Sequence, residues 1–533
     1  VSRGTAEVDN RDSLRFKELW TVADHLPERI KNSRRRVERK IRNNLDRRDD
    51  IRKIVTPDVF NVPVKSFFTS TSLSQRPSQL NPVDMIGGHL KATLMGTGGI
   101  STENAVSHSA KMLDSSQMGF TDPFHSPEGT RSGITTHLTL GVSKRGNEPV
   151  IKVWDVKNSK WADVSPTELH GKTLAFPDQY DTGDGKTFKP RKDLITVIRG
   201  GEGDPTNVKA NEVDYVLRSP KAMFSFTANL IPFLPSDQAN RAGMAARHME
   251  QTVPLKNPEE PLLQVASGSD QPAWDTWEKI LGQMQSHASP VSGTVKSVEA
   301  ERIVVAGDDG KKHVVQLYDN YPLNDSKAFV TSKPLVQKGD EVKKDDVIAD
   351  TSFTKGGVLS MGTNLRVGYL AYKGLNYEDG ITISETAAKK LTSEHLHKPR
   401  VYLDTGMMMG LKKFRANFPG VVSDANAAKL DEDGVIKRGE IVRPGDVIAT
   451  VLKEADPSAE QIMLKGIHKS LAKPYRDRSL TWNKPYTGVV TEVVRNGKEV
   501  VAYVKTAEEA DIGDKLTSRH GNKGVVVAIL PDE

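Results

Sequence analysis

The stretch GDKLTSRHGNKG (residues 513–524) runs directly into the apolar segment VVVAIL (525–530). Three glycines and one asparagine allow tight turns and positive φ, so we expect a compact loop next to a β-strand. The loop carries four cationic or potentially cationic side chains: Lys515, Arg519, His520 and Lys523. A structural turn does not need four such groups, whereas a loop that binds a polyanion does, and backbone N–H groups beside the glycines could add to the cradle. The spacing of a P-loop is not met.

The C-terminal half surrounding this loop is rich in β-branched residues, with turn signals about every ten residues from 290 onward, which predicts strands. GDEVKKDDVIA (339–349) and GEIVRPGDVIA (439–449) share the pattern G-[DE]-x-V-[KR]-x-x-D-V-I-A. Each copy predicts a strand, a tight polar turn and a second strand whose Val and Ile face inward. Such units suit barrel or sandwich-hybrid modules, or a common hairpin used twice. Lipoyl-like carrier domains also use the pattern, but no lysine lies at an obvious hairpin-tip acceptor position with the flanking residues that those domains require.

The composition excludes several classes of protein. The chain has 533 residues and no cysteine, which rules out disulfides, thiol catalysis, zinc ribbons and iron–sulfur clusters in this piece. The length predicts three or four domains. No apolar run approaches the about 18 residues of a spanning helix, and the N-terminus VSRGTAEVDN lacks the apolar core of a signal peptide. Because the chain does not begin with Met, we expect a processed or truncated piece of a longer, cytoplasmic protein.

The positive charge is concentrated in one segment. Residues 28–53 contain twelve Lys and Arg against five Asp and Glu, an excess of +7, so the remaining residues sum to about −1 of the total +6. This segment lacks Gly and Pro and places Ile30, Val37, Ile41, Leu45 and Ile51 at rough helical spacing, which predicts one amphipathic helix with a basic face. Phosphate contact by counterion release and a solvated, partly neutralised helix are both open at this point.

Three further segments carry chemistry. GLNYEDGITISE (374–385) contains Glu378 and Asp379, which could ligate Mg²⁺ or simply form a charged turn. SDQANRAGMAARHMEQ (236–251) predicts a helix whose Arg241 and Arg247 could each reach a phosphate or carboxylate, or remain exposed. Residues 54–145 are rich in Ser, Thr, Gly, Gln and Pro, which predicts irregular, ordered loops with amide and hydroxyl groups suited to phosphate and sugar contacts.

In chain order these segments resemble the second-largest subunit of multisubunit DNA-dependent RNA polymerases, the bacterial β subunit. LSQ…QLNP (73–82) with GTGG (96–99) is similar to LSQFMDQxNP…GPGG, and SPEGTRSGI (126–134) is similar to TPEGPNIGLI. FLPSDQANRAGM (233–244), followed by QTVP, is similar to FLEHDDANRALMG and QAVP, and GLNYEDGITISE is similar to GYNYEDSILVSE. GDKLTSRHGNKG nearly reproduces GDKMAGRHGNKG. RVER (36–39) in the basic segment also matches the family's RVERAVKERL.

The resemblance implies roles for five residues in phosphoryl transfer. Lys515 and Lys523 match lysines that contact phosphates near the RNA 3′ end, and Arg241 matches the arginine that steadies the triphosphate of the incoming nucleotide. Glu378 and Asp379 match carboxylates near the second Mg²⁺. The main Mg²⁺ is expected on the partner largest subunit, whose NADFDGD motif is absent here, and no zinc is expected in this chain. The chain alone is therefore expected to be inactive.

Further residues are expected to contact nucleic acid: Arg34, Arg35, Arg36, Arg39, Gln75, Lys91, Glu128, Arg131, Arg247, Gln251, Arg519, His520 and Asn522. Two departures from the family pattern carry expectations of their own. Gly88, Lys91 and Thr93 occupy positions associated with rifamycin contact, which predicts weak rifamycin binding. Thr102 stands where the family has arginine after GPGG, so a template or nucleotide contact is expected to be lost.

The predicted fold is a multi-domain α+β protein with a β-rich, double-psi-barrel-type catalytic module, a flap insertion and a mixed helical and loop fork region. The basic helix and fork region is expected at 1–145, a small β-rich external domain at 146–230, and the nucleotide-arginine helix with a linker at 231–290. The catalytic module is expected in two pieces, 291–414 and 485–533, and the flap at 415–484.

The expected function is a subunit of a DNA-dependent RNA polymerase that forms half of the active-site cleft. Expected partners are the largest subunit, the remaining β fragment, a promoter-specificity factor, template DNA, transcript RNA and NTPs, without a membrane. The alternative is a non-catalytic nucleic-acid-binding or assembly factor with the same fold; a carrier or carboxyltransferase component would lack the RHGNKG loop. A split subunit of a large bacteriophage, in the host cytoplasm or packaged in the virion, is the expected source, and a fragment of a cellular subunit is the alternative.

Overall fold

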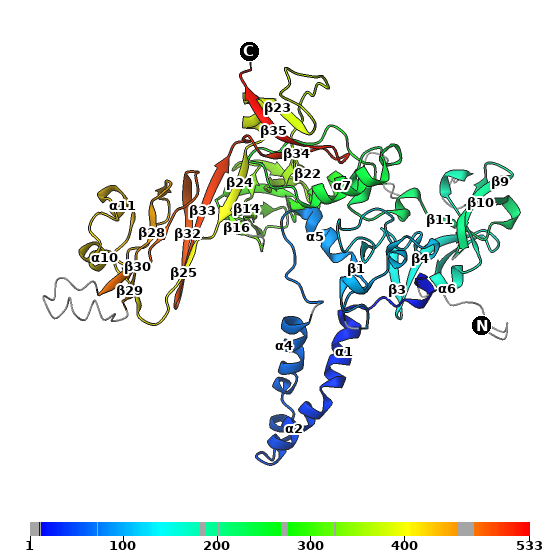
Figure 1. Ribbon diagram of the computed structural model, residues 1–533, viewed down its shortest axis with the longest axis horizontal. Helices are drawn as coiled ribbons and strands as arrows, with labels where there is room; N and C mark the ends of the chain where they lie inside the picture. Colours follow the sequence, from blue (N-terminus) through cyan, green and yellow to red (C-terminus); the bar gives the residue numbers. More distant parts are fainter. Residues whose placement is uncertain are drawn as a thin grey trace. The chain divides into compact units, whose positions relative to one another are not determined.

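The computed structural model describes residues 10, 12–71, 73–96, 98–181, 187–200, 202–267, 275–324, 327–455 and 474–532 (Figure 1). Two compact units divide the chain. The first comprises residues 1–77, 85–250 and 518–522, and the second comprises residues 78–84, 251–517 and 523–533. Part of the predicted flap (456–473), Thr97 of GTGG and both chain ends lie outside the described residues. The finer division into five segments stays a prediction.

Three helices replace the single basic helix predicted over residues 28–53, so that prediction was wrong. They are α1 (Val22–Asn32), α2 (Arg34–Leu45) and α3 (Ile51–Ile54). Ser33 separates the first two because its backbone leaves the helical region (φ −89°, ψ 6°) and its hydroxyl donates to the Arg29 carbonyl, 2.9 Å away. Asp50 starts the third helix by accepting from the Arg52 N–H. No residue of α1 or α2 is buried.

Residues 54–145 contain more regular structure than the predicted loops. Helix α4 (Asn61–Ser70) packs against α1, and helix α5 (Pro82–His89) follows. Strand β1 (Lys91–Thr93) pairs with β2 (Thr135–His137) in an antiparallel ladder. The composition of this region hid the helices because their apolar residues are few and interspersed with polar ones.

A seven-stranded sheet forms the predicted external region of the first unit. Its order is β10-β9-β6-β11-β4-β3, with β5 beside β4. The strands are β3 (Val142–Arg145), β4 (Glu148–Asp155), β5 (Lys160–Val164), β6 (Thr173–Ala175), β9 (Leu194–Arg199), β10 (Glu202–Lys209) and β11 (Tyr215–Leu217). Short elements complete it: α6 (Pro166–Leu169), β7 (Tyr180–Asp181) and β8 (Lys189–Pro190). Buried residues of β4 (Val150, Ile151 and Val153) and of β9 (Ile195, Val197 and Ile198) contribute to the core of the sheet.

The helix predicted over residues 236–251 is confirmed as α7 (Ala239–Glu250). Its small residues Ala242, Ala245 and Ala246 are buried, which places this face of the helix against the body of the first unit. Gln251 lies just beyond the end of the helix.

Small antiparallel sheets build most of the second unit, which confirms the β-rich prediction. Two larger sheets have the orders β15-β14-β13-β19 and β24-β33-β32-β27, the latter with β25 on β33. Their strands are β13 (Gly293–Val298), β14 (Arg302–Gly307), β15 (Lys312–Gln316), β19 (Glu341–Val342), β24 (Ser393–His397), β25 (Arg400–Tyr402), β27 (Ile441–Val442), β32 (Gly488–Asn496) and β33 (Glu499–Glu508).

Shorter elements surround these two sheets. The helices are α8 (Trp277–Gln285), α9 (Glu385–Lys390), α10 (Leu411–Asn417) and α11 (Asp424–Lys429). The short strands are β12 (His287–Ala288), β16 (Tyr321–Pro322), β17 (Phe329–Val330), β18 (Lys333–Pro334), β20 (Val347–Asp350), β21 (Thr354–Lys355), β22 (Val358–Leu359), β26 (Met407–Met409), β28 (Val447–Ala449), β29 (Val451–Glu454), β30 (Tyr475–Asp477) and β31 (Leu480–Thr481).

The two copies of the repeated motif fold alike, which confirms the predicted strand-turn-strand unit. Val342 and Ile348 in the first copy, like Val442 and Ile448 in the second, are buried. The turn has positive φ at the same position in both copies, 70° at Asp345 and 91° at Gly445. Asp and Gly both tolerate this conformation. The repeat in the sequence therefore reflects a repeated backbone geometry.

A three-stranded sheet carries the cationic loop. Strand β23 (Gly380–Ser384) runs parallel to β35 (Lys523–Leu530), which pairs antiparallel with β34 (Lys515–Thr517). The register places Gly380, Val525 and Lys515 side by side in one row across the sheet. Helices within the described ranges are all too short or too polar to cross a lipid bilayer.

Candidate nucleotide and nucleic-acid site

Lys515 and Lys523 flank the loop at the end of the β34–β35 hairpin. Lys515 is exposed and Lys523 is half-buried, and neither ammonium group forms an ion pair with the residues that the structure describes. Neighbouring strands lie about 4.8 Å apart, so the pairing of the two strands holds both lysines near one end of the sheet. The predicted pair of cations is thus brought together and left available.

Glu378 and Asp379 form the turn that enters β23, next to this hairpin. The Asp379 carbonyl accepts from the Val525 N–H at 2.9 Å, and a Cβ on Gly524 would meet the same carbonyl oxygen at 2.5 Å. Glu378 has a φ of 53°, in the left-handed region that a glutamate rarely occupies. Both carboxylates are exposed, and neither has a hydrogen bond or ion pair to another described residue. The structure therefore places two carboxylates beside the two lysines without pairing them.

Arg241 lies in the first turn of α7 and contacts the tip of the cationic loop within the first unit. Its Nη1 donates to the Gly521 carbonyl at 3.3 Å. Gly521 has a φ of 77°, and a Cβ there would approach the Arg241 carbonyl oxygen to 2.1 Å, so only glycine fits. The guanidinium remains exposed. The predicted nucleotide arginine and the predicted loop are neighbours, although 280 residues separate them in the sequence.

Arg519 and His520 contact protein groups rather than projecting freely. His520 Nδ1 lies 2.8 Å from Asp237 Oδ2, and Arg519 Nη1 donates to the Leu230 carbonyl at 3.5 Å. These contacts anchor the loop in the first unit, where residues 518–522 belong. Asp237 was missed by the sequence analysis, because nothing in its local sequence indicates a distant histidine partner. Asn522 is exposed at the same tip.

The other predicted contacts form smaller groups. Arg247 lies 3.4 Å from Glu128, which joins two predicted residues in one ion pair. Arg131 pairs with Glu103. The hydrogen bond from the Thr130 hydroxyl, and after it the one from Arg131, holds the pKa of the Glu103 carboxyl below its usual range. Gln75 and Gln251 are exposed in irregular segments.

The basic helices α1 and α2 present a largely unpaired cationic surface. Arg34, Arg35, Arg36 and Arg39 are all exposed. Arg34 bonds to Glu38 at 2.6 Å across one helical turn, and this contact raises the pKa of the guanidinium. Lys91 is exposed on β1, and Thr93 accepts from the Thr135 hydroxyl at 3.1 Å.

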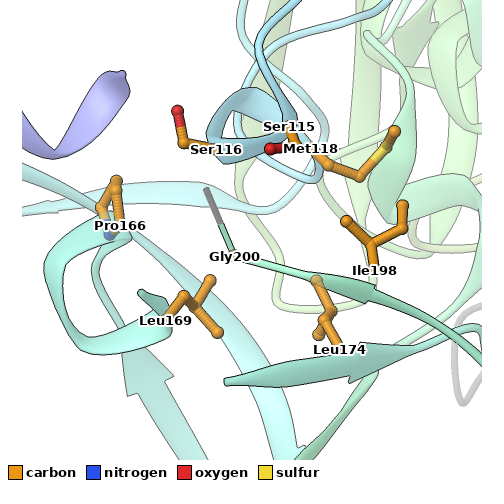
Figure 2. Close-up of a pocket in the computed structure, with 8 residues that line it drawn as sticks. All are labelled: Ser115, Ser116, Met118, Pro166, Leu169, Leu174, Ile198 and Gly200. Atoms are coloured by element: carbon orange, nitrogen blue, oxygen red, sulfur yellow. The ribbon is translucent and has the colours of Figure 1, made fainter. Parts of the chain in front are cut away.

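A small cavity in the first unit lies beneath the seven-stranded sheet (Figure 2). Its lining is mostly apolar: Ser115, Ser116, Met118, Pro166, Leu169, Leu174, Ile198 and Gly200. None of these lining side chains ionises near neutral pH, so the cavity offers no chemistry related to the cationic loop.

Comparison with known proteins finds similarity over two regions of this chain and to full-length relatives. Residues 288–533 match the family profile of RNA polymerase Rpb2, domain 6, and residues 75–143 match that of RNA polymerase Rpb2, domain 3. The chain is 31% identical to the DNA-directed RNA polymerase subunit beta of Prochlorococcus marinus (strain MIT 9312) over 556 aligned residues, which cover 99% of this chain and 49% of that protein. The chain is therefore similar to RNA polymerase β subunits over nearly all of its own length.

A second β-subunit relative gives the same result. The protein of Synechococcus elongatus (strain ATCC 33912 / PCC 7942 / FACHB-805) is 31% identical over 558 aligned residues, again covering 99% of this chain and 49% of the relative. The chain thus spans about half the length of the curated β subunits that it matches. The predicted resemblance is confirmed, and the predicted bacteriophage source stays a prediction.

Proposed function

We propose that this chain is a subunit of a DNA-dependent RNA polymerase and forms half of its active-site cleft. The observation that carries the proposal is the edge of the β23-β35-β34 sheet, where Lys515 and Lys523 stand unpaired near the unpaired carboxylates of Glu378 and Asp379 among the described residues. Opposite charges on adjoining strands and turns gain from pairing when they can reach each other. The lysines and the carboxylates are expected to stay unpaired if the lysines bind a polyanion and the carboxylates bind a cation.

Phosphoryl transfer gives this arrangement a chemical purpose, because the protein contributes mainly position and charge compensation. In our proposal Lys515 and Lys523 hold phosphates at the RNA 3′ end, and Arg241 binds the triphosphate of the incoming NTP through its planar donor fork. All three groups are cations, and their attraction to the phosphates strengthens as negative charge develops on the phosphate oxygens during the transfer.

Glu378 and Asp379 fit a role as partial ligands of a Mg²⁺ ion. Their oxygens are the hard donors that Mg²⁺ prefers, both are exposed, and no described residue neutralises either one. Two carboxylates cannot complete an octahedral shell, so the remaining positions would come from water, phosphate oxygens or the largest subunit. When bound, the ion would supply charge compensation at the phosphates.

The remaining predicted contacts would follow the nucleic acid. We propose that the exposed arginines of α1 and α2 bind phosphates and that Gln75, Lys91, Glu128, Arg131, Arg247 and Gln251 line the RNA–DNA hybrid and the fork. The same proposal includes two features of the fold, the double-psi-barrel character of the β23-β35-β34 sheet and the flap. It also includes three partners: the largest subunit, the remaining β portion and a specificity factor.

The decisive experiment measures templated NTP incorporation by the chain assembled with its partner subunits. Lys515→Ala and Lys523→Ala should each lower the elongation rate by roughly 10²–10³-fold, since each removes one preorganised cation from the transferring phosphates. The matched control is Lys498→Ala, an exposed lysine at the β32–β33 turn of the same unit, which should elongate normally. Co-purification with the partners checks that each variant still assembles.

Unchanged elongation by both lysine variants would refute the catalytic proposal. If the assembled wild type binds template and transcript but incorporates no NTP, the chain is instead a non-catalytic nucleic-acid-binding or assembly factor.

A further inference from the structure

Three ionisable side chains meet in the interior of the first unit, apart from the residues assigned to polymerase function. His125 lies in the loop before β2, His137 ends β2 and Glu250 ends α7; they are 0%, 2% and 9% exposed. The His125 and His137 Nε2 atoms lie 3.5 Å and 3.9 Å from Glu250 Oε1. Neither Nε2 has a hydrogen-bond partner among the residues that the structure describes. Buried ring nitrogens are normally satisfied, so two such atoms aimed at one carboxylate require an explanation.

The hydrogen bonds on the opposite ring atoms fix how these groups can act. His137 Nδ1 lies 2.9 Å from the His125 carbonyl oxygen, which can only accept, so Nδ1 carries the proton and Nε2 presents a bare lone pair. His125 Nδ1 lies 2.9 Å from the Ser225 hydroxyl. A histidine whose Nδ1–H is held by a carbonyl, with Nε2 free, is the usual form of a metal ligand.

Neighbouring groups hold the three ligands in place. The Thr227 hydroxyl donates to Glu250 Oε1 at 3.1 Å. The Asp122 carboxylate accepts from the backbone N–H groups of His125 and Ser225, at 2.9 Å and 2.6 Å. A Cβ on Gly87 would approach Glu250 Oε1 to 2.3 Å, so glycine leaves the carboxylate its room. Such supporting contacts are typical of metal sites.

We propose that His125 Nε2, His137 Nε2 and Glu250 Oε1 bind a Zn²⁺ ion that links the loop before β2, strand β2 and helix α7. Two imidazoles and one carboxylate form an established zinc donor set, with water in the fourth position. In a tetrahedral site with metal bonds of about 2.0–2.1 Å the donor atoms lie about 3.3–3.4 Å apart, close to the distances observed here. The rings are stacked, with centroids 3.6 Å apart and planes 4° apart, so binding requires them to tilt toward each other about χ2.

The test uses the complete, tag-free chain. After removal of metal, the wild type should bind one equivalent of Zn²⁺ or Co²⁺, and bound Co²⁺ should give the intense d–d absorption of a tetrahedral site. Saturating Zn²⁺ should raise the Tm by about 5–10 °C. His137→Gln and Glu250→Gln should each abolish the equivalent of bound metal. Glu508→Gln, in a second His-Glu cluster described below, is the matched control and should retain it.

Absence of a stoichiometric metal on the wild type, or an octahedral cobalt spectrum, would overturn the proposal. Because these readouts need no variant, they decide the matter even if a substitution impairs folding. Retention of one equivalent by folded His137→Gln and Glu250→Gln would also overturn it.

Discussion

Two clusters of the same composition, two histidines and one glutamate, occur in the two units of this chain and differ in their hydrogen bonds. In the first unit His125 and His137 face Glu250; in the second, His395 and His397 face Glu508 at 3.8 Å and 3.5 Å. The nitrogen–oxygen distances are alike in both. In the second cluster, however, Ser393 Oγ lies 2.9 Å from His395 Nε2, and Thr506 Oγ1 lies 3.2 Å from His397 Nε2.

This difference separates a structural network from a ligand site. Thr506 also donates to Glu508 Oε1 at 2.8 Å, so hydroxyls satisfy both the rings and the carboxylate of the second cluster. The first cluster lacks such hydroxyls on its Nε2 atoms and stacks its rings at 3.6 Å, whereas the rings of the second lie 6.3 Å apart. Residue type alone does not define a metal site; the partners of the donor atoms do.

The largest expected effect is a loss of stability on removing the tryptophan that packs against the second cluster. Trp482 is 1% exposed, meets the His397 ring edge-on with centroids 5.3 Å apart, and donates from Nε1 to the Tyr486 carbonyl at 2.7 Å. Trp482→Ala should lower the free energy of unfolding of the second unit by about 3–5 kcal/mol, as measured by native-state hydrogen exchange. Trp482→Phe should cost less. Zinc binding to the first cluster should be unchanged in Trp482→Ala, and its loss would contradict the contrast drawn between the two clusters.

The second expected effect is a dependence of stability on pH. Burial lowers the pKa of His395 and of His397 below 6.5. The Glu508 carboxylate raises both pKa values but does not outweigh burial, and Lys327 lowers them slightly further. Below pH 6.5 the unfolded chain therefore takes up protons that the folded cluster does not. Stability should fall as the pH drops from 6.5 toward the lowered pKa values of the folded state.

Urea denaturation of the second unit between pH 5 and pH 8 would measure this slope. The double variant His395→Gln and His397→Gln should flatten it. An unchanged slope in the double variant would show that other groups dominate the acid sensitivity.

The smallest expected effect concerns Thr227, which holds the carboxylate of the first cluster without being a ligand. Thr227→Val removes its hydrogen bond to Glu250 and should cost about 1 kcal/mol of stability. It should also weaken Zn²⁺ binding by roughly tenfold, since supporting residues of metal sites have effects of that size. Competition with a chromophoric chelator would measure the affinity, and Thr227→Ser should restore it. An unchanged affinity in Thr227→Val would assign this hydroxyl a purely structural role.

Much of the fold could be predicted where the pattern repeats or alternates locally. The two hairpins at 339–349 and 439–449 were found because both copies keep the glycine, the valine and the Asp-Val-Ile-Ala run of one pattern. The basic segment was predicted incorrectly as one helix, because periodicity does not register a serine hydroxyl that competes for a backbone carbonyl at Ser33. The helices α4 and α5 were missed because polar residues interrupt their apolar pattern.

The candidate polymerase site was predictable only through its motifs. Composition and spacing indicated a cationic loop and a pair of carboxylates, and the resemblance to β subunits assigned their roles. The contact of Arg241 with Gly521 and the pairing of His520 with Asp237 join segments about 280 residues apart. No local pattern encodes such a contact, because it depends on how remote elements pack.

By itself the sequence determined that this chain is a cysteine-free, mixed α/β protein that resembles RNA polymerase β subunits, with its charge in one segment and one loop. These properties depend on residue identity and short spacing, which the sequence states directly. Tertiary structure alone decided which lysines and carboxylates remain unpaired, and that His125, His137 and Glu250 meet in the interior. Each of these outcomes depends on distances of a few ångströms between segments far apart in the chain, which only the packed backbone fixes.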